Sequence, residues 1–174
     1  EQNGLLAVCE GRYDVPGYEL LADSTSEAEV LERLTAAQVT LLQSDEAYHA
    51  RRIELGRPLS GMELVGEYNP LEAGLVWACA ENKGCYTGQE IIARQITYDK
   101  VTRTLVGLTA AELPAPGTPL QVDGRSTGAI TSVAYSPALN APVGLAIVKR
   151  PLDTPGTMLQ AGDQAVTVVG LPFV

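Results

Sequence analysis

A lysine and a cysteine lie two positions apart, just before a predicted helix, in the stretch NKGCYTGQEIIAR (residues 82–94). A thiol reacts as its thiolate, and a nearby ammonium group or helix N-terminus favours that anion. Lys83 is two residues before Cys85, and the predicted helix start at Thr87 is two residues after it. The spacing makes Cys85 a candidate nucleophile with Lys83 as its charge partner. The alternative is a small buried cysteine without chemistry.

The residues that follow the cysteine, T-G-Q-E (87–90), match a capping box. In this motif a Thr hydroxyl accepts a hydrogen bond from an amide of the first turn, and a Glu three positions later reaches back to the capping residue. We therefore expect a helix from Thr87 to about Gln95. The capping box explains Thr87 and Glu90 without any function.

Four further residues need an interpretation. Glu72 follows a proline among apolar residues in NPLEAG, where its carboxylate could accept paired N–H donors of a planar heterocycle; the alternative is a surface glutamate. His49 is the only histidine and is expected to be a surface or packing residue. Cys9 and Cys79 lie in apolar sequence and are expected in the core. Three such cysteines do not make a four-ligand zinc or iron–sulfur site, so no metal is predicted.

The composition indicates a folded globular protein and argues against a nucleic-acid partner. The chain has 174 residues, of which 45% are hydrophobic and 19% charged. Its formal net charge is −9 and its aromatic content only 5%, which disfavours a broad phosphate-binding face or a base-stacking platform. Residues 83–106 are nevertheless net positive, with 4 basic and 2 acidic residues. A small anionic ligand would need only one or two such cations.

Cysteine usage and hydropathy bear on the compartment. The 3 cysteines have no paired spacing, so a disulfide framework is not expected and a reducing, cytoplasmic compartment fits best. No apolar run approaches about 18 residues, and no secretory signal is recognisable. The sequence starts at Glu1, without a methionine and inside a predicted strand. We therefore expect it to be a piece of a longer protein.

The first part of the chain is predicted to mix strands and helices. Periodicity and turn residues predict a strand–turn–strand–helix unit and then a second helix that Gly56 ends. The ranges are strands at 4–11 and 17–23 around a turn at 15–17, a helix over 24–38 capped by Ser24 or Ser26, and a helix over 45–55.

After residue 55 the sequence predicts a linker and then a region of short β strands. Residues 56–83 are predicted to be an ordered linker held down by Leu71, Leu75 and Trp77. After residue 100, short β runs alternate with Pro, Gly, Asp and Asn turns, which is typical of a small barrel or sandwich. The five predicted runs are 103–110, 118–124, 126–136, 141–150 and 164–170. We therefore place a domain boundary near residue 100 and predict an α+β body followed by a β domain.

These motifs together resemble a known family. KGCYTGQEIIAR (Lys83–Arg94) resembles the K-G-C-Y-x-G-Q-E-x-x-A-R signature of the YgfZ-type folate-binding proteins. These belong to the aminomethyltransferase superfamily, which includes the glycine-cleavage T-protein. ARRIELGRPLSGMEL is similar to the superfamily's R-x-E-x-G-x-P segment, NPLEAGL to its P-L-E element, and RTLVGL with the final β run to its C-terminal barrel. The resemblance covers most of residues 45–174.

The resemblance implies a fold, a ligand and roles for the residues. The fold would be a partial aminomethyltransferase-like (ferredoxin-like) folate-binding body over residues 1–100 and a small C-terminal antiparallel β-barrel over residues 101–174. The ligand would be tetrahydrofolate or a folate derivative. Glu72 matches the glutamate that contacts the pterin, and Arg103 lies near the position of a basic residue that meets the folate tail. The signature gives a catalytic role to Cys85 and Lys83, folate contacts to Tyr86, Gln89 and Arg94, and a structural role to Gly84, Thr87, Gly88 and Glu90.

The implied function is that of a cytoplasmic, monomeric accessory protein for iron–sulfur cluster assembly or repair, with support of tRNA modification. Its partners would be a folate and iron–sulfur client or assembly proteins, without nucleic acid or membrane. The first alternative is an aminomethyltransferase-type one-carbon transferase. Gly74, where YgfZ-type proteins more often carry Asn, favours this alternative, whereas the signature cysteine disfavours it. The second alternative is a non-catalytic interaction module. Full-length members have a further N-terminal stretch that holds part of the folate pocket, so a partial pocket is expected.

Overall fold

The computed structural model describes residues 5–11, 16–42, 44–80 and 83–173. By its internal contacts the chain divides into two compact units, residues 1–47 and residues 48–174. The predicted fold class is confirmed, because the first unit combines strands with a helix and the second contains a closed antiparallel barrel. The domain boundary near residue 100 stays a prediction; the barrel begins close to it, at Arg103.

The first unit has the predicted strand–strand–helix order. Strands β1 (Leu6–Glu10) and β2 (Gly17–Leu21) pair antiparallel, and the 3-10 turn η2 (Ser24–Ser26) leads into helix α1 (Glu27–Ala36). The predicted turn at 15–17 lies partly outside the described residues. Ser26 is the N-cap of α1, but its side chain makes no capping hydrogen bond, so the expected serine cap is wrong in that detail.

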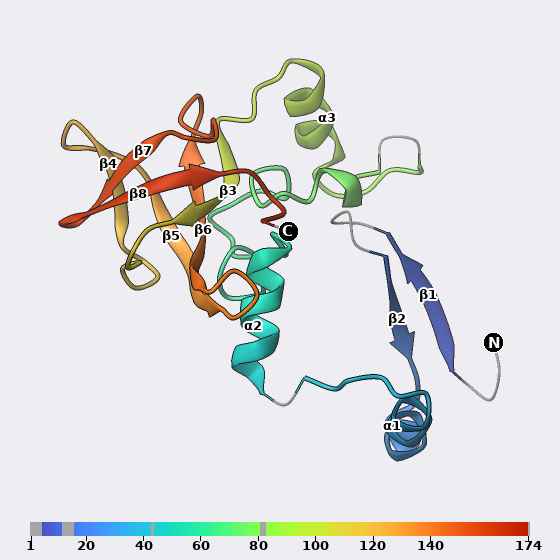
Figure 1. The fold of residues 1–174 in the computed structure, drawn as a ribbon. Coiled ribbons are helices and arrows are strands. Elements are labelled where there is room, and N and C mark those ends of the chain that lie inside the picture. The colour runs from blue at the N-terminus through green and yellow to red at the C-terminus, as the bar shows by residue number, and fades with distance from the viewer. Residues whose placement is uncertain (1–4, 12–15, 43, 81–82, 174) are drawn as a thin grey trace. The chain divides into compact units, whose positions relative to one another are not determined.

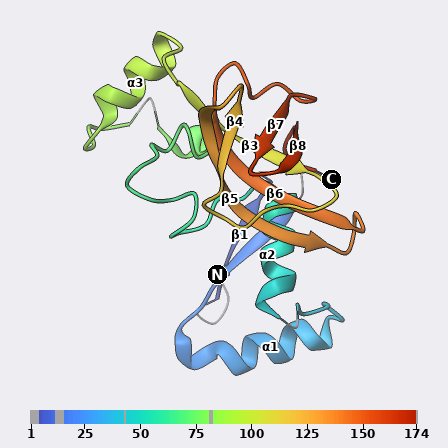
Figure 2. The same cartoon turned by 90° about the vertical axis from the view of Figure 1, so that its left-hand side faces the viewer.

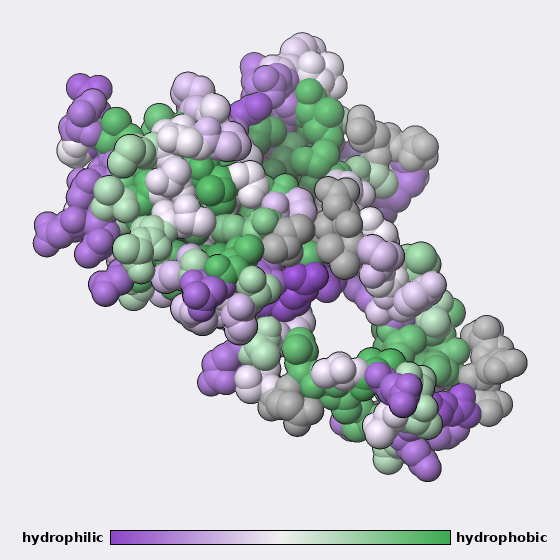
Figure 3. All heavy atoms as spheres, in the orientation of Figure 1, coloured by the Kyte–Doolittle hydropathy of each residue, from purple (hydrophilic) through white to green (hydrophobic). Residues whose placement is uncertain are grey.

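Many apolar side chains of this unit face solvent. In Figure 3 hydrophobic surface gathers over β1, β2 and α1. Cys9 on β1 is exposed, so its expected place in the core is wrong. A two-stranded sheet with one helix buries too little area to cover its own apolar side chains. The exposed large residues of these elements are Leu6, Val8, Tyr18, Leu20, Leu21 and Leu31.

Helix α2 (Asp45–Glu54) packs its C-terminal half into the second unit. The Ser44 hydroxyl accepts a hydrogen bond from the amide of Ala47 (3.2 Å), which satisfies one free donor of the first turn. Gly56 ends the helix at φ +71°, a conformation that strongly favours glycine. A Cβ there would also lie 3.0 Å from the side chain of Leu171. Both constraints explain why this stop is a glycine.

A buried ion pair links α2 to the turn segment that follows it and, through Ser132 of β5 (Arg125–Ser136), to the barrel. Arg52 is 1% exposed and Glu63 is fully buried, with 3.2 Å between Nη1 and Oε2. Ser132 links them, because its hydroxyl accepts from the Arg52 guanidinium (2.6 Å) and donates to Glu63 (2.5 Å). His49 accepts a further hydrogen bond from Arg52 Nε (3.1 Å). His49 is therefore the packing residue that the sequence predicted.

The segment after α2 is an ordered succession of turns, as predicted. It contains the 3-10 turn η3 (Val76–Ala78). Leu71 is buried and anchors the segment, but Trp77 is 46% exposed, so its predicted anchoring role is wrong. Cys79 is half-buried rather than in the core, and its thiol donates to the carbonyl of Leu75 (3.4 Å). This partial burial raises the pKa of the Cys79 thiol.

Six antiparallel strands close the barrel in the order β3–β6–β5–β4–β7–β8, and β8 pairs back to β3 (Figures 1 and 2). The β runs predicted from the sequence correspond to five of these strands, and β7 was not predicted. The strands are β3 (Arg103–Thr109), β4 (Pro119–Val122), β5 (Arg125–Ser136), β6 (Ala141–Lys149), β7 (Met158–Ala161) and β8 (Gln164–Val169).

Alternate side chains of β3 and β6 belong to two different cores. Val106 and Val148 are in the cluster that fills the barrel. Leu105 and Ile147 are in a second cluster with Ile53 of α2, on the outside of the barrel. Because successive side chains of a strand point to opposite faces, the ends of β3 and β6 continue this outer face.

Candidate functional site

Glu72 is held in place by a reciprocal capping box. The Asn69 side chain accepts from the amide of Glu72 (3.0 Å), and the Glu72 carboxylate accepts from the amide of Asn69 (3.2 Å). Pro70 follows the cap, where its missing N–H costs nothing. The turn closes by a hydrogen bond from the Leu75 amide to the Pro70 carbonyl (2.8 Å). The sequence N-P-L-E thus fixes the carboxylate locally.

Arg103, at the start of β3, clamps the same carboxylate. Its Nε donates to Oε1 of Glu72 (2.9 Å) and its Nη2 donates to Oε2 (3.2 Å), a two-point arrangement that fixes both groups. The Glu72 side chain is 5% exposed and that of Arg103 30%. The hydrogen bond to Glu72 raises the pKa of Arg103. The alternative interpretation of Glu72 as a surface glutamate is therefore wrong.

Tyr68 and Glu67 complete the surroundings of Arg103. The guanidinium lies over the Tyr68 ring, 5.1 Å from its centroid, and Nη2 also donates to the Glu67 carbonyl (3.2 Å). Burial raises the pKa of the Tyr68 hydroxyl, and neighbouring Glu67 raises it further. No pattern in the sequence pointed to Tyr68. Asn69 could have been found from the N-P-x-E spacing.

Glu72 retains some capacity to bind a ligand. Its Oε2 accepts from Asn69 and Arg103, whereas Oε1 accepts only the Arg103 Nε hydrogen bond among the described residues. A carboxylate oxygen has two lone pairs, so Oε1 can take one more N–H donor. The arrangement can therefore bind an N–H group of a heterocycle at a carboxylate whose orientation is fixed.

The Cys85 segment differs from its predicted form. Helix α3 is Gln89–Thr97, two residues later than expected, and its N-cap is Gly88 at φ +88° without a side-chain capping bond. The prediction that T-G-Q-E forms a capping box is therefore wrong. Instead, the Gln89 side-chain oxygen accepts from the Tyr86 amide (3.3 Å), while the Gln89 amide donates to the Tyr86 carbonyl (3.2 Å). A left-handed residue before the helix redirects the chain, so Thr87 cannot cap it.

The remaining signature residues lie at the surface around α3. Cys85 is exposed. The Lys83 ammonium lies over the Tyr86 ring, 5.0 Å from its centroid. Glu90 pairs with Arg94 one turn later (3.1 Å), with both side chains exposed, so Glu90 does not serve as a reciprocal cap. Exposure leaves the Cys85 thiol open to a reagent or a partner.

The structure brings some of the predicted site residues together and not others. Glu72 and Arg103, 31 positions apart, are in direct contact. Among the described residues, no hydrogen bond or ion pair joins Cys85 or Lys83 to that pair. Gly84, Thr87 and Gly88 are exposed turn residues, with open space where a Cβ of either glycine would lie.

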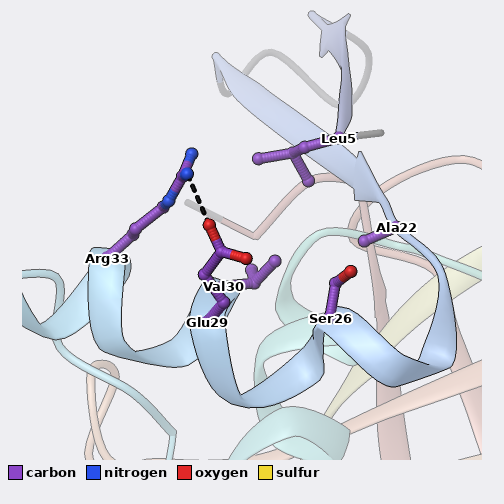
Figure 4. Close-up of a pocket in the computed structure, with 6 residues that line it drawn as sticks. All are labelled: Leu5, Ala22, Ser26, Glu29, Val30 and Arg33. Carbon is purple, nitrogen blue, oxygen red and sulfur yellow. Dashed lines mark hydrogen bonds and ion pairs between the residues drawn. The ribbon is translucent and has the colours of Figure 1, made fainter. Parts of the chain in front are cut away.

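Two hollows are lined by residues that the structure describes. The one in the first unit lies between α1 and the strand ends and is bordered by the Arg33–Glu29 ion pair (Figure 4). Its volume of about 10 Å³ is room for one water molecule. The other lies on the outside of the barrel beside Arg103, has a volume of about 260 Å³ and is lined by Tyr68 and Lys149. Of these two, the second is large enough to take part of an organic ligand.

Comparison with known proteins assigns the barrel. Residues 103–174 match the glycine cleavage T-protein C-terminal barrel domain. A chloroplastic protein of Arabidopsis thaliana, provisionally named a transferase, is 36% identical over 129 residues, which are 74% of this chain and 30% of that protein. The aminomethyltransferase of Halothermothrix orenii is 31% identical over 167 residues, which are 91% of this chain and 46% of that protein. The chain thus spans less than half of these curated relatives.

A solved structure has the same fold. The aminomethyltransferase T of the glycine cleavage system from Bartonella henselae superimposes with a TM-score of 0.81 at 23% identity. The match covers 99% of this chain and 50% of that one. The fold is therefore aminomethyltransferase-like and ends in a T-protein-type barrel. The chain is thus similar in sequence and in fold to aminomethyltransferases.

The backbone conformation of Gly74 bears on the choice between the transferase and YgfZ-type alternatives. Gly74 has φ +78°, a left-handed conformation in which Gly and Asn are the favoured residues. The backbone thus accounts for Gly or Asn here, so Gly74 does not separate transferases from YgfZ-type proteins.

In the described part of the chain, no helix has the length and apolarity needed to cross a membrane.

Proposed function

We propose that the protein binds a tetrahydrofolate-type ligand at the Glu72–Arg103 pair and serves iron–sulfur proteins as an accessory factor, with Cys85 as its reactive thiol. The observation that carries the proposal is the buried Glu72 carboxylate, held at two points by Arg103. By the superfamily resemblance, Glu72 matches the glutamate that contacts the pterin, and Arg103 lies near the position of a basic residue that meets the folate tail. The aminomethyltransferase names of the relatives support a folate-related role.

The chemistry of the site fits the ligand. A reduced pterin presents N–H groups, and the free lone pair on Glu72 Oε1 can accept one of them. Arg103 orients the carboxylate through its two hydrogen bonds. The adjoining 260 Å³ hollow gives room for the part of the ligand beyond the pterin. Tetrahydrofolate would bring the one-carbon chemistry, and this chain would bind and orient it.

Cys85 supplies the thiol in this proposal. Its exposure, in the loop four residues before α3 begins, allows it to meet a partner protein. Lys83, two residues away, contributes positive charge to this exposed loop. We propose a cytoplasmic, monomeric protein whose partners are iron–sulfur client or assembly proteins. Unpaired Cys9, Cys79 and Cys85 fit a reducing compartment.

Complementation tests this function. A strain lacking the gene should recover iron–sulfur enzyme activity with the wild-type gene and with Thr87→Ala, which removes an exposed hydroxyl from the same loop. Cys85→Ala and Glu72→Gln should both fail to restore activity. Full activity with Cys85→Ala would refute the thiol role, and full activity with Glu72→Gln would refute the folate site.

The second candidate is a one-carbon transferase of the aminomethyltransferase type. The names of the relatives favour it, since several aminomethyltransferases align at 31–36% identity. Turnover of an aminomethyl donor with tetrahydrofolate by the complete gene product would establish this activity. If the protein neither turns over the aminomethyl donor nor binds any folate, the alternative of a non-catalytic interaction module would replace both proposed functions.

A further inference from the structure

Helix α3 has one apolar side that faces solvent. Its inner side carries Ile92, Gln95 and Ile96, which are buried or half-buried and recur at helical spacing. Ile91 and Tyr98 are seven positions apart, so they lie on one side of the helix, and they are 64% and 66% exposed. The outer side of a surface helix normally carries polar side chains. An exposed isoleucine and tyrosine on that side therefore indicate a surface that a partner covers.

An exposed lysine lies over a tyrosine ring at each end of this surface. In the loop before α3, the Lys83 ammonium is 5.0 Å from the centroid of the Tyr86 ring. At the other end, the Lys100 ammonium is 5.6 Å from the centroid of the Tyr98 ring. Neither lysine forms an ion pair with a residue that the structure describes. The nine-residue helix between them is about 13 Å long, so two uncompensated cations frame an apolar centre.

This combination suits a protein partner whose carboxylates surround an apolar spot. Protein interfaces have an apolar, often aromatic, core and a polar rim. Residues 83–106 carry 4 basic and 2 acidic residues, whereas residues 1–82 carry 5 basic and 15 acidic residues. Charges more than about 8 Å apart are largely screened at physiological salt. The local positive sign at α3, and not the net charge of −9, therefore governs which partner can approach.

Other occupants fit this surface less well. A nucleic acid or an anionic membrane surface is held by many Lys and Arg contacts, and two uncompensated lysines are too few. A symmetric pair of copies would bring the same surface of each chain together, so that lysines would face lysines. A separate acidic protein satisfies both the apolar and the charged side chains.

We propose that α3 and the loop before it form the docking surface for an acidic protein partner. Ile91 and Tyr98 make the apolar contact, and Lys83 and Lys100 pair with carboxylates of the partner. Exposed Cys85 lies in the same loop, between Lys83 and Tyr86 in the sequence, so docking brings the partner close to its thiol. The identity of the partner as an iron–sulfur protein rests on the proposed function.

Site-specific photo-crosslinking in cells tests this surface in the complete gene product. The probe is p-benzoylphenylalanine in place of Ile91, and the control is the same probe in place of Met158, which is comparably exposed (67%) on β7. The probe at Ile91 should crosslink to a protein that mass spectrometry identifies, through a peptide rich in Asp and Glu. Its yield should be at least about fivefold higher than at Met158, which corresponds to roughly 1 kcal/mol of binding preference.

Charge reversal tests the acidic nature of the partner. Lys100→Glu should lower the crosslinking yield at Ile91 at least about fivefold, because an attractive pair at the rim becomes repulsive. The matched control is Arg125→Glu, which reverses an exposed charge at the start of β5 and should leave the yield unchanged. Lys100→Glu should also keep its affinity for 5-formyltetrahydrofolate in calorimetry, because Lys100 contacts Tyr98 and not the Glu72–Arg103 pair.

Several results would overturn the inference. These are crosslinks from Ile91 to a second copy or to another segment of the same chain, no crosslink at Ile91, equal yields at Ile91 and Met158, and equal effects of Lys100→Glu and Arg125→Glu. A parallel loss of folate affinity in Lys100→Glu would also overturn it. Lysine-dependent crosslinking to an acidic protein that holds no iron–sulfur cluster would support the docking surface, while the iron–sulfur role in the proposed function would fail.

Discussion

The isosteric change Glu63→Gln should destabilise the protein severely. The Glu63 carboxylate accepts hydrogen bonds from Arg52 (3.2 Å), from the Ser132 hydroxyl (2.5 Å) and from the Leu59 amide (3.0 Å). The amide keeps the shape but leaves the Arg52 charge buried without a counter-ion. Breaking a buried pair from one side costs about 3–5 kcal/mol. That is a large share of a total stability of about 5–15 kcal/mol.

Urea unfolding followed by far-UV circular dichroism measures the effect, with the slope of the transition checked for each variant. The double variant Arg52→Met/Glu63→Gln should be more stable than Glu63→Gln alone, because it removes the unpaired charge. Glu90→Gln is the control, since this exposed carboxylate should contribute less than about 1 kcal/mol. A loss below about 1 kcal/mol for Glu63→Gln, or no recovery in the double variant, would refute this reasoning.

Three further predictions concern pH and backbone geometry. Burial and neighbouring Arg52 lower the pKa of His49, so its contribution to stability is full above about pH 6.5 and is lost as the pH falls through the lowered value. Melting temperatures between pH 5 and 8 should show this dependence, and His49→Gln should lessen it. Gly107→Ala should cost about 1–3 kcal/mol in urea unfolding, because a Cβ would lie 2.8 Å from the Phe173 ring; an unchanged midpoint would contradict it. Gly88→Ala should destabilise the start of α3 by about 1–2 kcal/mol, seen as faster hydrogen exchange of its first amides, and unchanged exchange would contradict the left-handed cap.

Local patterns in the sequence predict most of the elements. The stop of α2 at Gly56 and five of the barrel strands follow from periodicity and turn chemistry, which act over a few residues. The capping boxes show where such reasoning fails. T-G-Q-E has the spacing of a capping box, but left-handed Gly88 prevents Thr87 from capping. N-P-L-E forms the real capping box, and it orients Glu72.

Tertiary contacts determine what local patterns cannot. Nothing near Glu72 in the sequence predicts that Arg103, 31 positions later, clamps it; the superfamily resemblance suggested both residues separately. The exposure of Cys9 and Trp77 likewise depends on which surfaces the rest of the structure covers. Apolar neighbours in sequence do not give that information. The Arg52–Glu63 pair went unrecognised for the same reason.

Calorimetric titration of the complete gene product with 5-formyltetrahydrofolate tests the folate site most directly. We predict saturable binding that Glu72→Gln weakens at least tenfold, because the amide replaces an ionised acceptor and weakens the Arg103 clamp. The control Glu90→Gln should bind like the wild type, since Glu90 lies on the exposed face of α3. Absence of binding by the wild type, or equal affinities of wild type and Glu72→Gln, would contradict the account.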